Sequence, residues 1–193
     1  MKDGSLRNLP FVLVSGGCRS GKSAYAERLA QYFSRACLYI ATAEISDEEM
    51  RERVKAHQRA RGAGWRLHEV TGAQAPELWR AVASLVEPGE AVLLDCLSLW
   101  ASACMRDGKA PADFPEMCRN LLSALWRLDC PVVVVSSEVG MGVVPASPEG
   151  RAFRDMAGLA SQTAARLATG VILMVSGIPL AVKGELPVFE QAC

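Results

Sequence analysis

The sequence lacks the features that would indicate a membrane, secreted or nucleic-acid-binding protein. Lys plus Arg and Asp plus Glu number 21 each, so no net charge favours binding to nucleic acid or to an anionic membrane. No apolar run is long enough to span a bilayer, and the N-terminus has no apolar signal core. The seven cysteines are odd in number and contain no C-x-x-C pair, which argues against a disulfide framework and a zinc site. We therefore expect a cytoplasmic protein with no membrane span and no nucleic-acid partner.

What the chain does contain is enough apolar material for one core. Half of its 193 residues are hydrophobic, and no linker, repeat or low-complexity segment divides them, so we expect a single domain over residues 1–193. Continuous apolar runs are typical of strands covered on both faces, and amphipathic segments alternate with them. Strands are expected at 11–14, 37–42, 67–70, 91–94, 132–135, 171–175 and 180–183. Helices are expected at 23–34, 45–61, 76–85, 97–105, 114–128 and 147–167. This alternation predicts an α/β fold of three layers, with a largely parallel central sheet.

The first strand leads into a glycine-rich motif. Residues 11–25 read FVLVSGGCRSGKSAY, and Gly16-x-x-x-x-Gly21-Lys22-Ser23 is the pattern of a phosphate-binding loop, or P-loop. Glycines allow turns that point successive N–H groups into one concavity, and the start of a helix favours anions. Lys22 would reach the β- and γ-phosphates of a nucleotide, and Ser23 would offer its hydroxyl to Mg²⁺. Strand, loop and helix occur in the required order, so a chance glycine-rich turn is the weaker alternative.

Two further segments are expected beside the P-loop. Asp95 ends the apolar run 91–94, which is where a P-loop protein places an acid beside Mg²⁺; an exposed acid at a strand end is the alternative interpretation. The run 132–135 leads into a glycine-bearing loop at 136–142, and ligands bind at this edge of open α/β sheets.

The helix expected at 45–61 carries a candidate nucleophile. It begins with a capping box at 46–49, and His57 shares one face with Met50 and Val54. A neutral imidazole is a competent nucleophile near pH 7, but a histidine on an apolar stripe is also commonly a packed core residue.

Cations surround this histidine in the sequence, and they could hold a triphosphate or form a solvated helix face. They are Arg51, Arg53, Lys55, Arg59, Arg61 and Arg66. The other histidine, His68, has no motif around it and is interpreted as structural.

Seven segments, taken in order, resemble the bifunctional adenosylcobinamide kinase and adenosylcobinamide-phosphate guanylyltransferase of cobalamin biosynthesis. The most specific parts are GGxRSGKS, the R-x-x-x-H-x-x-x-R pattern before a Trp, and EVGMG-x-VP. The segments are LVSGGCRSGKS (13–23), LYIATAE (38–44), DEEMRERVKAHQRARGAGW (47–65), VLLDCLSLW (92–100), SSEVGMGVVP (136–145), FRDMAGLASQ (153–162) and VSGIPLAVK (175–183). Residues 184–193 extend past the usual end of the family as a C-terminal extension.

The resemblance implies two reactions on one P-loop domain. Adenosylcobinamide is first phosphorylated by a nucleoside triphosphate, GTP or ATP. A histidine, in this chain His57, then takes GMP from GTP and passes it to adenosylcobinamide phosphate, which gives adenosylcobinamide-GDP. Mg²⁺ held by Ser23 and Asp95, a catalytic Lys22 and a homotrimer are also implied. Two alternatives stay open: an enzyme that retains one of the two activities, and a GTP-binding module without turnover.

The resemblance also implies which residues contact the nucleotide. They are Ser15, Gly16, Gly17, Cys18, Arg19, Ser20, Gly21, Lys22, Ser23, Ala41, Thr42, Ala43, Gln58, Arg59, Ala60, Arg61, Glu69 and Asp95. Glu138 and the glycines at 140–142 are expected to shape the mouth of the site. Arg151, Arg154 and Asp155 are expected to hold the long helix or a subunit contact, since Arg151 and Asp155 are four residues apart.

Overall fold

The fold is seen in a computed structural model, which describes residues 9–43, 64–106 and 112–187. The helix expected at 45–61, with His57, Gln58, Arg59, Ala60 and Arg61, lies outside the described residues. In chain order the elements are β1 (Phe11–Gly16), α1 (Lys22–Phe33), β2 (Cys37–Ala41), β3 (Trp65–Glu69), the 3₁₀ helix η1 (Gly72–Glu77), α3 (Leu78–Leu85), β4 (Ala91–Asp95), α4 (Leu97–Arg106), α5 (Phe114–Trp126), β5 (Val132–Ser137), α6 (Pro148–Leu167), β6 (Gly170–Val175) and β7 (Ile178–Lys183).

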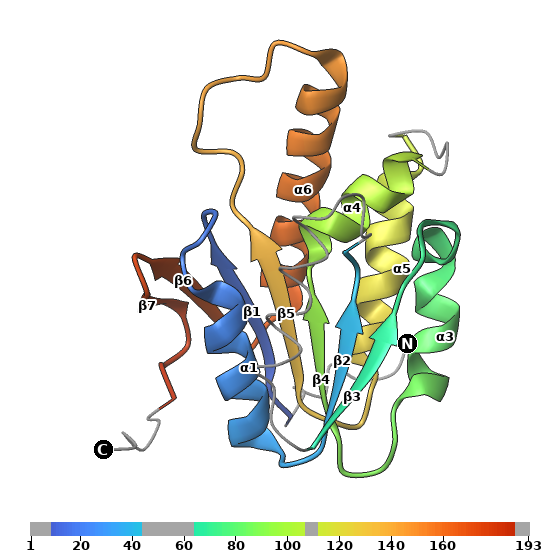
Figure 1. Ribbon diagram of the computed structural model, residues 1–193, viewed down its shortest axis with the longest axis vertical. Coiled ribbons are helices and arrows are strands. Elements are labelled where there is room, and N and C mark those ends of the chain that lie inside the picture. The colour runs from blue at the N-terminus through green and yellow to red at the C-terminus, as the bar shows by residue number, and fades with distance from the viewer. Residues whose placement is uncertain (1–8, 44–63, 107–111, 188–193) are drawn as a thin grey trace.

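The strands form one seven-stranded sheet in the order β3-β2-β4-β5-β1-β6-β7 (Figure 1). Every pairing is parallel except that of β6 with the edge strand β7, which is antiparallel. Parallel neighbours require crossover connections, and helices lie in the described connections from β3 to β4, from β4 to β5 and from β5 to β6. All six parallel strands therefore end at the same edge of the sheet, which is the upper edge in Figure 1.

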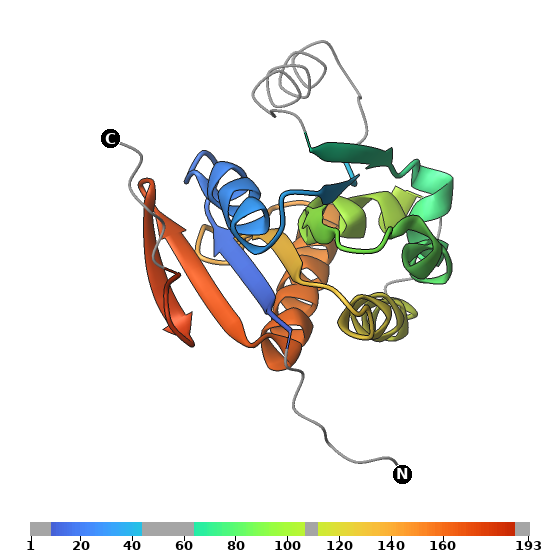
Figure 2. The same ribbon diagram turned by 90° about the horizontal axis from the view of Figure 1, so that it is seen from below.

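Helices cover both faces of the sheet, so the fold has three layers (Figure 2). On one face α1 packs its buried residues against alternate strand residues such as Val12, Val14 and Leu93. On the other face α3, α4, α5 and α6 pack against the intervening residues, among them Leu13 and Leu94. Because each central strand is covered on both sides, its apolar sequence is continuous, as predicted.

The predicted strands and helices are confirmed wherever the structure describes them, with ends that differ by a few residues. Ser147 caps α6 as expected: its Oγ accepts a hydrogen bond of 3.0 Å from the Gly150 N–H. The helix expected at 76–85 differs at its start, because a capping box between Thr71 and Gln74 opens the 3₁₀ helix η1 first. The α-helix begins only at Leu78.

No helix within 9–43, 64–106 and 112–187 is both long enough and apolar enough to cross a membrane.

Candidate functional site

The glycine-rich motif forms a loop between β1 and α1. Gly21 has φ +88° and the exposed Arg19 has φ 55°, and both angles lie in the left-handed region that such a turn requires. Lys22, the first residue of α1, folds its ammonium back over the loop and donates a 3.1 Å hydrogen bond to the Gly17 carbonyl. A positive group and the start of a helix thus meet over the same turn, which is the arrangement that binds phosphate.

The loop is held on two sides by segments from distant parts of the sequence. The Glu138 N–H, just after β5, donates to the Gly16 carbonyl at 2.9 Å, and the Gly177 N–H, between β6 and β7, donates to the Ser20 carbonyl at 3.0 Å. Gly16 itself leaves no room for a side chain, since a Cβ there would lie 2.8 Å from the Met174 carbonyl oxygen. The P-loop is therefore fixed between the end of β5 and the turn that follows β6.

Asp95, at the end of β4, is on the same face of the sheet as α1. Leu93, two residues earlier in the strand, packs in the core cluster beneath α1, and alternate strand residues share a face. The hydroxyl of Tyr39 from β2, which is buried in the same cluster, donates to Asp95 Oδ2 at 2.8 Å. One carboxylate oxygen is therefore oriented by Tyr39.

The charges of Lys22 and Asp95 both act on the buried thiol of Cys96, which follows β4. Burial is the main cause that raises the pKa of Cys96 to about 11, and the negative charge of Asp95 adds to it. The hydrogen bond between Cys96 and Ser98 and the positive charge of Lys22 act in the opposite direction. Both charges are therefore close enough to Cys96 to influence its thiol.

The ends of β2, β3 and β4 lie in register, with Ala41 opposite both Asp95 and Glu69. Thr42 joins β2 to β4: its Oγ1 donates to the Cys96 carbonyl at 2.7 Å and accepts from the Cys96 N–H at 2.8 Å. The Thr42 side chain is 2 % exposed, and its hydroxyl is bonded to the main chain of Cys96 at this edge of the sheet.

The number of strands between a candidate residue and β1 gives its distance from the P-loop across the sheet. Strands are spaced by about 4.8 Å, so Asp95, two strands from β1, is about 10 Å across from the P-loop strand. Glu69, four strands away, is about 19 Å across. Glu69 is thus too distant to touch phosphates held at the P-loop, although it lies on the same edge.

Arg66 is placed differently from the expectation that it helps to hold a triphosphate. Its guanidinium makes two hydrogen bonds to the buried Glu90, with Nε to Oε1 at 2.7 Å and Nη2 to Oε2 at 2.8 Å. Nη2 also donates to the Leu85 carbonyl. The Arg66 bond is the main cause that lowers the pKa of Glu90. Glu90 precedes β4, so this pair lies at the amino edge of the sheet, opposite the P-loop.

The structure brings most of the predicted site residues to the carboxyl edge of the sheet. These are Ser15, Gly16, Gly17, Cys18, Arg19, Ser20, Gly21, Lys22, Ser23, Ala41, Thr42, Ala43, Glu69 and Asp95. His68 is half-buried on β3, opposite Ile40.

Sequence reasoning missed three residues that support this edge, namely Tyr39, Met174 and Gly177. A signal existed for Gly177, which follows a strand, but none pointed to Tyr39 or Met174.

The donors at this edge suit a metal that is bound together with a nucleotide. Within the described parts of the chain, no group of three or more His, Cys, Asp or Glu side chains is placed to hold an ion. Mg²⁺ commonly takes one or two protein oxygens and completes its shell with water and substrate phosphates. The Ser23 hydroxyl and the Asp95 carboxylate are donors of that kind.

Comparison with known proteins adds a family match. The family described as "Cobinamide kinase / cobinamide phosphate guanyltransferase" matches residues 12–182. The bifunctional adenosylcobalamin biosynthesis protein CobU of Escherichia coli (strain K12) is 37% identical over 185 residues, which cover 90% of this chain and 99% of that protein. The bifunctional adenosylcobalamin biosynthesis protein CobP of Pseudomonas aeruginosa is 38% identical over 177 residues, covering 90% and 97%.

A solved protein of Pyrococcus horikoshii OT3 has TM-score 0.54 and 8% identity, and the match covers 90% of this chain and 86% of the other. That likeness concerns the fold alone.

Proposed function

The chain belongs to the cobinamide kinase / cobinamide phosphate guanyltransferase family. From this premise we propose that it catalyses two successive reactions in cobalamin biosynthesis. It phosphorylates adenosylcobinamide with GTP or ATP and then transfers GMP from GTP to adenosylcobinamide phosphate. The observation that carries the proposal is the P-loop, in which the Lys22 ammonium lies over the turn at the start of α1 and bonds to the Gly17 carbonyl.

In the kinase step the P-loop amides and Lys22 hold the β- and γ-phosphates. The hydroxyl of the aminopropanol arm attacks the γ-phosphorus, the bond to the β,γ-bridging oxygen breaks, and a nucleoside diphosphate leaves. Lys22 stabilises the charge that develops on the phosphoryl oxygens. Ser23 and Asp95 are the residues that would hold Mg²⁺, which neutralises charge on the phosphates when it is bound.

In the transfer step the imidazole of His57 attacks the α-phosphorus of GTP, and pyrophosphate leaves. A phosphate oxygen of adenosylcobinamide phosphate then attacks the same phosphorus, the P–N bond breaks, and adenosylcobinamide-GDP is released with the histidine restored. His57 lies outside the described residues, so its role is proposed from the family resemblance and from the nucleophilicity of imidazole.

Labelled GTP tests the transfer step. The protein is incubated with α-labelled or γ-labelled GTP, and bound label is measured after denaturation. We expect acid-labile, base-stable label from the α-position only, and its loss in His57→Asn. His68→Asn, which changes the half-buried histidine of β3, is the matched control and should retain the label. Label that persists in His57→Asn, or that disappears only in His68→Asn, would place the nucleophile elsewhere.

Separate assays test whether both activities are retained. One follows phosphorylation of adenosylcobinamide, and the other follows GMP transfer to synthetic adenosylcobinamide phosphate. Product in one assay alone would reduce the proposal to a kinase or to a guanylyltransferase. GTP binding without product in either assay would indicate a non-catalytic module. We also expect a homotrimer in the cytoplasm, as in the family, and sedimentation equilibrium measures the number of subunits.

A further inference from the structure

One arginine of α6 has no partner for a buried nitrogen. Nη1 of Arg154 is shielded from solvent and finds no hydrogen-bond partner among the residues that the structure describes. The rest of the side chain is half-buried. A buried guanidinium nitrogen without a partner costs free energy, because its lost hydration is not replaced. Arg154 Nη1 is therefore a candidate donor to a bound ligand.

The contacts of α6 define the direction in which Arg154 points. Gly150, Arg154 and Ser161 are spaced by four and seven residues, so they lie on one face of the helix. The Ser161 hydroxyl is 2.8 Å from that of Ser136 in β5. At the other end, a Cβ on Gly150 would lie 2.8 Å from Pro145 Cβ. Arg154 therefore lies between a contact of α6 with β5 and a contact of α6 with the stretch of chain that joins β5 to α6.

This stretch, residues 138–147, rises above the strand ends and returns to the start of α6 (Figure 1). Arg151 fixes its return by donating to the carbonyls of Pro145 and Ala146 at 3.1 and 2.7 Å. Its beginning is fixed to the P-loop by the bond from the Glu138 N–H to the Gly16 carbonyl. The connection thus begins beside the P-loop and ends against the first turn of α6, on the face that carries Arg154.

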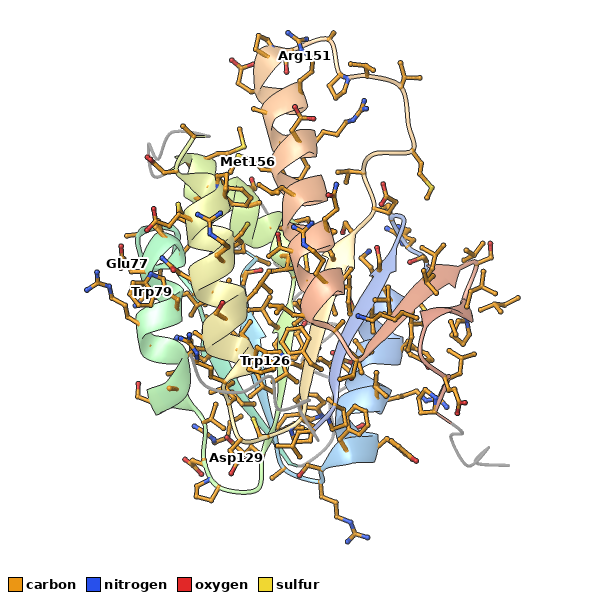
Figure 3. The ribbon with its side chains drawn as sticks, turned by 180° about the vertical axis from the view of Figure 1, so that it is seen from behind. Glu77, Trp79, Trp126, Asp129, Arg151 and Met156 are labelled. Carbon is orange, nitrogen blue, oxygen red and sulfur yellow. The ribbon has the colours of Figure 1, made fainter. Side chains whose placement is uncertain are left out.

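Met156 gives an independent check on this orientation. It is labelled in Figure 3 on the side of α6 toward α5, and it belongs to the core cluster there. Arg154 is two residues earlier, which is a rotation of about 200° around the helix. Arg154 therefore points away from α5. Seven residues from Ser161, it also lies about 10 Å further along the helix, beyond the carboxyl end of β5.

We propose that Arg154 binds the phosphate monoester of the acceptor, adenosylcobinamide phosphate, in the transfer reaction; this rests on the proposed function. A guanidinium binds phosphate through paired, charge-assisted hydrogen bonds. The nucleotide phosphates already have ligands in the P-loop amides and Lys22, at the start of α1. Arg154 comes from α6, on the opposite face of the sheet, so the two sets of phosphates are approached from different sides. Arg154 Nη1 makes no hydrogen bond that would hold α6 among the described residues, and the expected subunit contact stays a prediction.

The proposal predicts a difference between the two reactions. In the kinase step the acceptor is an uncharged alcohol, whereas in the transfer step it carries the phosphate. Arg154→Gln should therefore raise the KM for adenosylcobinamide phosphate by about 10- to 100-fold, as expected for losing hydrogen bonds to a charged group. The KM for adenosylcobinamide and the Kd for GTP should each change by less than about threefold, because neither involves this phosphate. Arg154→Lys should recover part of the loss, since lysine keeps the charge but not the paired geometry.

Arg166→Gln is the matched control, because Arg166 is an exposed arginine of the last turn of the same helix and bonds only to Thr163 in the described residues. It should leave all three constants unchanged. Thermal melts check folding: Arg154→Met, which keeps the side-chain volume and removes the unpaired charge, should melt at or above the Tm of the parent.

The other results overturn the proposal in distinguishable ways. An unchanged KM for the phosphorylated acceptor excludes Arg154 from its site. A parallel loss of GTP affinity assigns Arg154 to a nucleotide phosphate. An equal rise in KM for both acceptors, or a large fall in the Tm of Arg154→Met, indicates a structural role.

A binding measurement separates this proposal from the proposed function. Calorimetry with the phosphate ester of 1-amino-2-propanol, without nucleotide, should detect binding to the parent and to Arg166→Gln, and none to Arg154→Gln. If the parent catalyses neither reaction but shows this pattern, the proposed function fails and the phosphate site stands. If the parent does not bind the ester, or Arg154→Gln binds it equally well, the phosphate site is rejected.

Discussion

Gly16 and Gly17 are adjacent in the P-loop, yet alanine should destabilise the protein only at Gly16. A Cβ on Gly16 would lie 2.5 Å from Ser20 Oγ and 2.8 Å from the Met174 carbonyl oxygen. Ser20 can rotate its hydroxyl away, but the Met174 carbonyl belongs to β6, which pairs with β1 along its length. A Cβ on Gly17 would meet no atom within 4 Å, and the φ of Gly17 is outside the left-handed region.

The expected loss of stability in Gly16→Ala follows from the contact with the Met174 carbonyl of β6. Inserting a methyl group into a packed site costs about 1–3 kcal/mol, and for a chain of this size that lowers Tm by about 2–4 °C per kcal/mol. Gly16→Ala should therefore lower Tm by about 2–12 °C. The loop must also move away from β6, which displaces the amides that hold phosphate, so the affinity for GTP should fall about tenfold or more, a change of about 1.4 kcal/mol. Gly17→Ala should leave Tm within about 2 °C.

Two measurements check this pair of variants. Thermal melts without nucleotide measure the change in Tm that the packing contact causes. Isothermal titration measures the affinity of the loop for GTP. The interpretation of the P-loop is refuted if Gly16→Ala keeps the Tm and GTP affinity of the parent, or if Gly17→Ala loses as much as Gly16→Ala.

Three further perturbations test separate parts of the molecule. Lys22→Ala should lower kcat/KM of both reactions by about 10²–10³-fold; GMP transfer that keeps normal rate and GTP affinity would show that the second step uses another site. Glu90→Ala removes a 4 % exposed carboxylate and should cost about 2 kcal/mol at pH 7. Because the folded pKa of Glu90 is lowered, its contribution is full above the ordinary value of about 4.5 and is lost as pH falls through the lowered pKa. Melts from pH 7 to pH 3 should thus converge for parent and variant, and a constant gap would contradict the ion pair. Iodoacetamide at pH 7.5 should alkylate the exposed Cys18 before the buried Cys96 and Cys118, whose pKa values are raised to about 11 and 12. GTP should protect Cys18 from alkylation. Equal labelling of all three thiols would contradict the burial of Cys96 and Cys118.

Local chemistry explains why so much of the fold could be predicted. A run such as 132–135 has few stable alternatives to a strand covered on both faces, and the glycines of the P-loop specify a turn within eight residues. Ser147 and Pro148 marked the start of α6 for the same reason, because capping depends on neighbours in the sequence.

The supports of the site could not be predicted, because they depend on the order of the strands. Tyr39 reaches Asp95 across 56 positions, and Gly177 reaches Ser20 only because β6 lies beside β1. Arg66 was expected near the triphosphate because it is close to His57 in the sequence. Its position on β3 instead places its guanidinium against Glu90, at the amino edge of the sheet.

A single-turnover chase tests the central claim most directly. The protein is loaded with α-labelled GTP and Mg²⁺, freed of nucleotide by rapid gel filtration, and mixed with adenosylcobinamide phosphate alone. Our account predicts that the label leaves the protein and is recovered as adenosylcobinamide-GDP in amounts equal to the label lost. Label that stays on the protein in the presence of the acceptor, or a parent protein that carries no label after loading, would contradict it.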